Sequence, residues 1–145
     1  MKIVIIGDGK VGYKLAKQLS EENYDVVLVD NNAEKLKIAI NKLDIFCVTG
    51  DGVSADVQIE AGVPEADLVI ACASTDELNM LSCLVARHLG ARHTIARVRN
   101  PLYYKQIDIL KEDLRLSMAV NPELAVANEI ARVLILPSAS KVETF

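Results

Sequence analysis

The chain has little of what several classes of protein require. Tryptophan is absent and aromatic residues make up 4% of its 145 residues, which disfavours a base-stacking surface for nucleic acid. A net charge of −4 without a run of Lys or Arg points the same way. No apolar run approaches the ~18 residues that cross a membrane, and Lys2 leads directly into an apolar strand rather than a signal peptide. We therefore expect neither nucleic-acid binding nor direct membrane insertion.

Cysteine and histidine are also scarce. The three cysteines, Cys47, Cys72 and Cys83, show no CxxC spacing, which argues against a disulfide scaffold or a zinc site and fits a reducing cytoplasm. His88 and His93 flank a predicted helix-to-strand turn. That turn lies away from the edge of the sheet where ligands bind, so we expect no catalytic residue and no metal site.

Short apolar runs alternate with helical patterns along the whole chain. Strands are predicted near residues 2–6, 25–29, 45–48, 67–72, 94–98 and 116–120, and helices near residues 10–22, 32–42, 54–62, 76–89, 101–111 and 122–136. This alternation predicts an α/β fold of the Rossmann type: a doubly wound, parallel, six-stranded sheet in the order 3-2-1-4-5-6, with helices on both faces. One dinucleotide-binding domain over residues 1–136 accounts for the pattern.

A glycine-rich turn follows the first strand. In Gly7-Asp8-Gly9-Lys10-Val11-Gly12, the first glycine permits a tight turn, the second lets the backbone approach a pyrophosphate, and the third lets the helix pack closely. The free N–H groups of that helix then face the phosphates. Asp30 ends the second strand, where its carboxylate can accept both ribose hydroxyls of an adenosine and repel a 2′-phosphate. These features predict NAD as the ligand in preference to NADP.

The aspartate inside the glycine turn conflicts with this prediction, because a carboxylate beside a pyrophosphate should repel it. Two solutions are open from the sequence: Lys10 neutralises Asp8, or Asp8 points to solvent.

Two further turns are expected at the same edge of the sheet. Residues 50–52, with Asp51 at their centre, either flank the adenine or simply form a strand-to-helix turn with Ser54 as the N-cap. Ala73 and Ser74 follow the fourth strand, opposite the glycine turn, and their backbone groups are predicted to contact the ligand. Because Ser74 and Glu77 have the spacing of a capping box, a purely structural role for that turn is the alternative.

The fifth strand supplies the cation. Arg97 and Arg99 lie on one face of the strand at its carboxyl end. Arg97 is predicted to bind phosphate oxygens, and an ion pair with Asp51 or Glu77 is the alternative. Arg99 is expected to be structural.

The last predicted helix, residues 122–136, is apolar on more than one side. Leu124, Ile130 and Leu134 mark one face, and Val133 and Leu136 widen it. A terminal helix of this kind is usually buried on two sides, which favours a homodimer over packing within the monomer.

With these motifs in place, the chain resembles the regulator-of-K⁺-conductance (RCK or KTN) domains, in particular the N-terminal domains of TrkA-type potassium-uptake regulatory proteins. The resemblance rests on the glycine turn, Asp30, and the segments 50–52, 76–79, 96–101 and 120–123. It implies binding of NAD(H) and, in many members, ATP or ADP, with ligand roles for residues 7–11, Asp30, Ala73, Ser74 and Arg97. It also implies dimers that assemble into rings, and makes residues 137–145 the start of a linker to an absent C-terminal domain.

The function expected from these observations is that of a nucleotide-sensing regulatory subunit rather than an enzyme. By the resemblance, its partner is a membrane potassium transporter or channel, and it lies in the cytoplasm, peripheral to the inner face of the cell membrane. A dehydrogenase needs a substrate domain and a proton donor, for which the chain has no evident room. The alternative is the cofactor-binding half of an NAD-dependent dehydrogenase.

Overall fold

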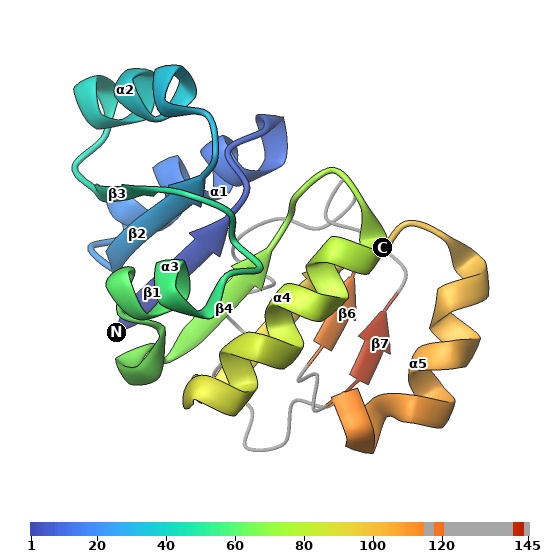
Figure 1. Cartoon of the computed structure of the whole chain (residues 1–145). Coiled ribbons are helices and arrows are strands. Elements are labelled where there is room, and N and C mark those ends of the chain that lie inside the picture. Colours follow the sequence, from blue (N-terminus) through green and yellow to red (C-terminus); the bar gives the residue numbers. More distant parts are fainter. Residues whose placement is uncertain (115–117, 121–140, 144–145) are drawn as a thin grey trace.

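The computed structural model describes residues 1–114, 118–120 and 141–143 (Figure 1). Its strands are β1 (Lys2–Ile6), β2 (Asp25–Asp30), β3 (Phe46–Thr49), β4 (Leu68–Ala71), β5 (His93–Arg97), β6 (Met118–Val120) and β7 (Lys141–Glu143). Its helices are α1 (Lys10–Glu21), α2 (Ala33–Lys42), α3 (Ala55–Glu60), α4 (Asp76–Leu89), α5 (Pro101–Leu114) and a short 3₁₀ turn, η1 (Val63–Glu65). The predicted Rossmann-type α/β fold is confirmed.

The strands form one parallel sheet in the order β3-β2-β1-β4-β5-β6-β7. The chain therefore reverses its winding direction between β1 and β4, and the crevice at this reversal is where such sheets bind ligands. The predicted order of the first six strands is correct. The predicted number of six is wrong, because residues 141–143 pair with β6 as a seventh strand.

Two hydrophobic layers hold the helices on opposite faces of the sheet. Ile3 and Ile5 of β1 pack with Leu15 and Leu19 of α1, whereas Val4 and Ile6 point to the layer that contains η1 and α4. Since successive residues of a strand face opposite sides, the four residues from Ile3 to Ile6 are all apolar and serve both layers. Figure 1 shows α3 and α4 in front of the sheet and α1 behind it.

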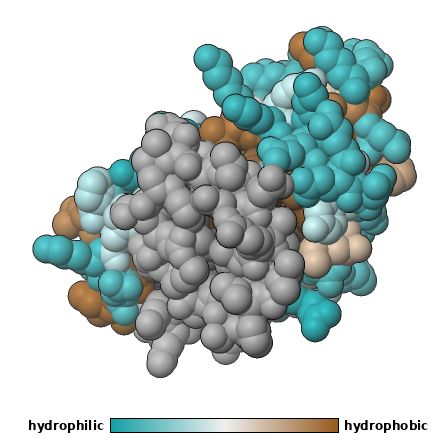
Figure 2. All heavy atoms as spheres, turned by 180° about the vertical axis from the view of Figure 1, so that it is seen from behind, coloured by the Kyte–Doolittle hydropathy of each residue, from teal (hydrophilic) through white to brown (hydrophobic). Residues whose placement is uncertain are grey.

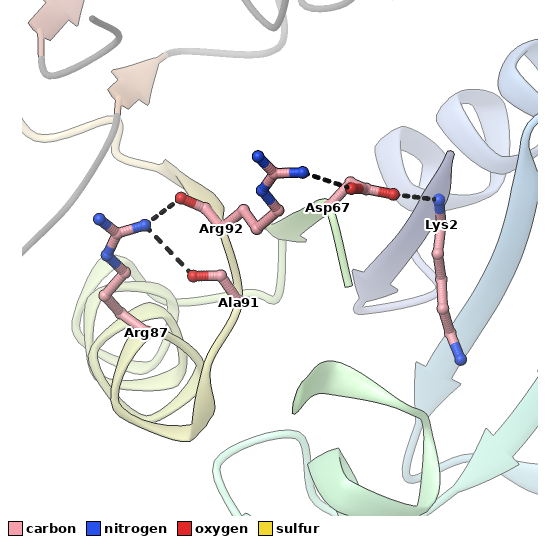
Figure 3. A network of polar contacts seen from close by, with 5 residues as sticks. All are labelled: Lys2, Asp67, Arg87, Ala91 and Arg92. Carbon is pink, nitrogen blue, oxygen red and sulfur yellow. Dashed lines mark hydrogen bonds and ion pairs between the residues drawn. The ribbon is translucent and has the colours of Figure 1, made fainter. Parts of the chain in front are cut away.

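A polar network holds the amino ends of the strands (Figure 3). One carboxylate oxygen of Asp67 accepts the backbone N–H of Lys2 at 2.8 Å, and the other lies 3.7 Å from the guanidinium of Arg92. Arg87 donates to the carbonyl of Ala91 at 3.2 Å. His93 starts the adjoining strand, so the structure places it at this end, as expected.

The predicted helix 122–136 and most of residues 137–145 lie outside the described residues, so the domain limits stay a prediction. In the part of the chain that the structure describes, no helix combines the length and apolar character that crossing a bilayer would require. Viewed from behind, much of the described surface is hydrophilic, with hydrophobic residues in smaller groups (Figure 2).

Candidate nucleotide-binding cleft

A cleft of about 350 Å³ opens at the carboxyl ends of β1, β2 and β4. Its lining comes from four turns that are distant in sequence, from the end of β5, and from residues of α2 and α4. The residues that line it are Ile6, Gly7, Asp8, Gly9, Val29, Asp30, Asn31, Asn32, Lys35, Gly50, Asp51, Gly52, Val53, Cys72, Ala73, Ser74, Leu78, Ser82 and Arg97. The structure thus brings together most of the predicted site residues. Lys10, Val11 and Gly12 adjoin the cleft as the first turn of α1.

The glycine turn has to be glycine at two of its positions. Gly7 has a φ of +108°, and a Cβ there would lie 2.8 Å from the backbone nitrogen of Ala73. A Cβ at Gly12 would overlap the carbonyl oxygen of Gly7. These contacts let α1 start directly against the end of β1 and bring the turn close to the loop after β4.

Gly9 has a different role, because a Cβ there would meet no atom within 4 Å. Gly9 is the N-cap of α1, and no side chain among the described residues caps this helix. The N–H groups of Lys10, Val11 and Gly12 therefore form an uncapped first turn at the positive end of the helix dipole. Bare backbone beside open space suits a diphosphate, so the residues present fit this part of a dinucleotide.

Asp30 lies half-buried at the cleft, and two backbone groups hold its carboxylate. Its Oδ1 accepts the N–H of Asp8 at 3.2 Å, and its Oδ2 accepts the N–H of Asn32 at 2.9 Å. Each carboxylate oxygen can accept more than one hydrogen bond. The carboxylate is thus oriented in advance and can still receive the two hydroxyls of a ribose.

Neither expectation for Asp8 is correct. Its side chain is only 6% exposed, so it does not point to solvent. Burial and then the negative charge of Asp30 raise its pKa to about 6, and the cation that opposes them is Lys35 of α2 rather than Lys10. Lys35 lines the cleft as well. The local sequence favoured Lys10 because it is close along the chain, whereas the fold brings Lys35 across from α2.

The turn after β3 is a strand-to-helix turn with Ser54 as the N-cap, as the structural alternative predicted. Ser54 caps α3 by accepting the N–H of Val57 at 3.4 Å, and the Asp51 carboxylate accepts the N–H of Val53 at 3.0 Å. Asp51 nevertheless lines the cleft, with its side chain exposed. The turn is therefore a capped helix start that also forms one wall of the site.

Gln58 of α3 supports this wall, and the sequence analysis missed it. Its side chain is fully buried, and its Nε2 donates to the carbonyls of Gly52 at 2.8 Å and of Ser82 at 3.1 Å. Gln58 thus ties the turn after β3 to α4. A polar residue at a core position of an otherwise amphipathic helix was the signal that could have revealed it.

The turn after β4 differs from the prediction in two respects. The helix cap is Thr75, which accepts the N–H of Leu78 at 3.3 Å, and not Ser74. The N–H of Ala73 already donates to Oδ1 of Asn79 at 2.7 Å. Ala73 and Ser74 line the cleft, as expected, but the backbone donor of Ala73 is engaged by a buried side chain of α4.

Arg97 lies half-buried at the cleft, at the end of β5. Burial raises the pKa of the Cys72 thiol to about 12, and the foremost opposing influence is the positive charge of Arg97. The Cys72 thiol donates to the Gly7 carbonyl at 3.6 Å, and Arg97, Cys72 and Gly7 all line the cleft. Arg99 is structural, as expected, and donates to the Ser74 carbonyl at 3.1 Å.

Glu77, an alternative partner of Arg97, has another contact. Its carboxylate accepts the hydroxyl of Tyr103, and this hydrogen bond lowers the pKa of Glu77. Among the described residues, no three His, Cys, Asp or Glu side chains are grouped to hold a metal ion.

The sequence matches one protein family over most of its length. The model of the family described as TrkA-N domain matches residues 3–122. The Trk system potassium uptake protein TrkA homolog of Archaeoglobus fulgidus is 36% identical over 145 residues, which cover 100% of this chain and 33% of the relative. The Trk system potassium uptake protein TrkA of Vibrio alginolyticus is 38% identical over 148 residues, with 100% and 32% covered. The chain therefore spans about a third of the length of these relatives.

Solved structures share the fold at lower identity. The TrkA-N domain of the inner membrane protein YbaL from Escherichia coli has a TM-score of 0.74 and 18% identity, covering 92% of this chain and 93% of that one. The GsuK channel bound to NAD has a TM-score of 0.69 and 22% identity, covering 81% and 21%. ChuY, a reductase from E. coli O157:H7, has a TM-score of 0.70 and 15% identity, covering 99% and 96%. At these identities the likeness concerns the fold alone.

Proposed function

Because this chain belongs to the TrkA-N domain family, we propose that it is a nucleotide-sensing regulatory domain of a potassium transport system and that it binds NAD(H) in the cleft. The observation that carries the proposal is the convergence of an uncapped glycine turn with a carboxylate held by that same turn. Relatives named as potassium uptake proteins and a channel of the same fold bound to NAD support it. ATP and ADP are further candidate ligands.

In the proposed complex, the diphosphate lies against the backbone of residues 7–12, at the start of α1. The adenosine ribose donates to Asp30, and Asp51 flanks the adenine end. Ala73 and Ser74 form the opposite wall, and Arg97 supplies positive charge to the phosphates. NAD itself provides a diphosphate and a nicotinamide whose charge changes with its redox state, while the protein binds and orients it.

A preference for NAD over NADP follows from two charges at the cleft. Asp30 repels a 2′-phosphate. Lys35, which also lines the cleft, attracts one. Asp30 is held by two backbone N–H groups at the point where the ribose binds, so we expect its effect to dominate.

The proposed regulation is a shift between conformations of an oligomer. The ligand contacts β2 through Asp30 and β5 through Arg97, and so spans both halves of the sheet. A ligand biases one arrangement of subunits only by its differential affinity, about 1.4 kcal/mol for each factor of ten. Reduced and oxidised NAD differ at the nicotinamide and can therefore favour different arrangements. A membrane potassium transporter or channel, at the cytoplasmic face, would respond to this change.

We further propose that the chain forms a homodimer through segment 122–136, on the strength of its sequence pattern, with rings as the higher assembly. Val133→Glu combined with Leu136→Glu should produce monomers in sedimentation velocity. Asn128→Glu, a polar exchange in the same segment, serves as the control. Dimers of undiminished stability in the double variant would refute this interface.

Calorimetry with NAD⁺, NADH, NADP⁺, ADP and ATP tests the nucleotide assignment. We expect saturable binding of NAD⁺ and NADH, weaker binding of NADP⁺, and no consumption of NADH on prolonged incubation. Turnover upon addition of a separate substrate domain would favour the cofactor-binding half of a dehydrogenase instead. Absence of binding by every nucleotide would contradict both.

A further inference from the structure

One buried amide joins the two strand ends that form the far wall of the cleft. Asn79, in the first turn of α4, is 1% exposed. Its Oδ1 accepts the N–H of Ala73 at 2.7 Å, and its Nδ2 donates to the carbonyls of Ala73 at 3.1 Å and of Arg97 at 3.0 Å. One side chain therefore contacts backbone groups that follow β4 and that end β5.

A second residue of the same helical turn holds the chain just beyond. The Asp76 carboxylate accepts the backbone N–H of Arg99 at 3.0 Å and of Asn100 at 2.9 Å, one on each oxygen. Between these contacts, the carbonyl of Val98 accepts the hydroxyl of Tyr104 at 2.6 Å. Each residue from 97 to 100 thus has a backbone group bound by a side chain. We call Asp76 and Asn79 the α4 clamp.

The hydrogen bonds of the α4 clamp lie just beyond the end of the pairing between β4 and β5. The pairing between β4 and β5 ends at Ala71 with Ala96, one residue before Arg97 and two before Ala73. Beyond that point the backbones separate to admit the cleft, and the amide of Asn79 provides the hydrogen bonds that a further pair of strand residues would have made. The buried amide is fully engaged, as polar groups at such positions need to be.

The position of Arg97 depends on this arrangement. Its carbonyl is bound by Asn79, and Arg97 lines the cleft together with Cys72 and the glycine turn. A shift of the backbone at Arg97 would move the guanidinium relative to the phosphates. Guanidinium–phosphate hydrogen bonds are strongly directional, so a small displacement weakens them.

Resting on the nucleotide binding proposed above, we propose that the α4 clamp is a positioning device for diphosphate recognition, which acts by holding Arg97 against the cleft. Asp76 and Asn79 are positioning residues in this proposal, since neither needs to touch the ligand. Their loss should weaken ligands that carry a diphosphate and leave the adenosine end, bound at Asp30, unaffected.

The test measures the affinities for NAD⁺ and ADP by calorimetry and the affinity for adenosine by NMR titration, on the full chain. Asn79→Ala should weaken NAD⁺ and ADP by about tenfold to a hundredfold, the range expected when a hydrogen bond to a charged group is lost. Adenosine affinity should change less than twofold. In an Arg97→Gln background, Asn79→Ala should cause little further loss, because both changes remove the same interaction.

Cys83→Ala is the matched control. Cys83 lies one turn further along α4, is fully buried, and also contacts β5, through a hydrogen bond from Sγ to the Ile95 carbonyl at 3.4 Å. It does not line the cleft. Its substitution should lower the stability without lowering the affinity for NAD⁺. If Asn79→Ala does not fold, Asp76→Asn tests the same clamp and should give the same selective loss, to a smaller degree.

The outcomes separate this inference from the proposal on which it rests. If the unmodified protein binds neither NAD⁺ nor ADP, the proposed function fails and the clamp has no ligand to serve. Suppose instead that the unmodified protein binds NAD⁺. If the clamp variants then lower the affinity for adenosine as much as that for NAD⁺, or if their loss of affinity adds fully to that of Arg97→Gln, the clamp only supports the fold. Either of these last results would overturn the inference alone.

Discussion

The backbone N–H of Asp8 donates to the carboxylate of Asp30 at 3.2 Å, so the glycine turn and the end of β2 form one unit. The same geometry places the carboxylate of Asp8 in the cleft with that of Asp30. One arrangement of the chain therefore places both Asp30, which suits a ribose, and Asp8, which would repel a diphosphate, in the cleft.

The first prediction concerns Asp30. Asp30→Arg should lower the affinity for NAD⁺ by about a hundredfold or more, since it removes two hydrogen bonds to a charged acceptor that are each worth about 1.5–3 kcal/mol. Calorimetry measures the loss. Asp25→Arg provides a matched control, because Asp25 is an exposed acid at the opposite end of the same strand. Unchanged affinity in Asp30→Arg would mean that the adenosine binds elsewhere.

The second prediction is a pH dependence caused by Asp8, whose pKa is raised to about 6 by burial and by Asp30. Above that pH the charged carboxylate repels a diphosphate, so the affinity for NAD⁺ should rise as the pH falls from 8 through 6. Two unit charges ~6 Å apart at an effective dielectric constant of ~40 interact with about 1.4 kcal/mol, or roughly tenfold in affinity. NAD⁺ is the right probe, since the terminal phosphate of ADP has a pKa of about 6 itself.

Asp8→Asn should abolish this dependence and bind NAD⁺ more tightly at pH 8. It should also be more stable there. The pKa of Asp8 in the folded protein lies above the ordinary value of 3.8, so the stability of the unmodified protein falls as the pH rises from about 3.8 to about 6. Lys10→Ala, which changes a charge next to Asp8 in sequence, is the comparison. A pH profile in Asp8→Asn identical to that of the unmodified protein would exclude Asp8 as the source.

The third prediction separates two glycines of the same turn. Gly12→Ala should lower the free energy of unfolding by about 3 kcal/mol, because the new methyl group would overlap the Gly7 carbonyl, a backbone group that cannot easily move. Gly9→Ala should cost less than about 1 kcal/mol, since its Cβ meets open space. It should still weaken NAD⁺, because that space is where we place the diphosphate. Urea unfolding and calorimetry of both variants make the comparison.

The fourth prediction concerns Gln58. Gln58→Glu would place a carboxylate against the carbonyls of Gly52 and Ser82, and should lower the free energy of unfolding by about 3 kcal/mol at pH 8. The pKa of the new carboxyl would be raised in the folded state, so the loss should shrink as the pH falls. Glu60→Gln, on the exposed part of the same helix, is the control. Equal stability of the two variants at pH 8 would contradict the role of Gln58.

Much of the fold follows from local pattern. The apolar run of residues 2–6, the glycine turn and the acid at Asp30 each occupy the predicted element, and the predicted strand order of the first six strands is correct. The periodicity of a strand or a helix is a pattern among residues a few positions apart, so it can be read directly from the sequence. The short strand of residues 141–143 had no such pattern, and its place depends on pairing with β6.

The sequence by itself determined the order of the first six strands, the glycine turn that opens the cleft and the acid that ends β2, because backbone sterics and residue periodicity act locally. Only the tertiary structure decided that Asp8 is buried beside Lys35, that Thr75 caps α4, and that Asn79 joins the ends of β4 and β5. These partners lie on different elements. Whether they meet depends on the register and separation of the strands that carry them, which no local pattern encodes.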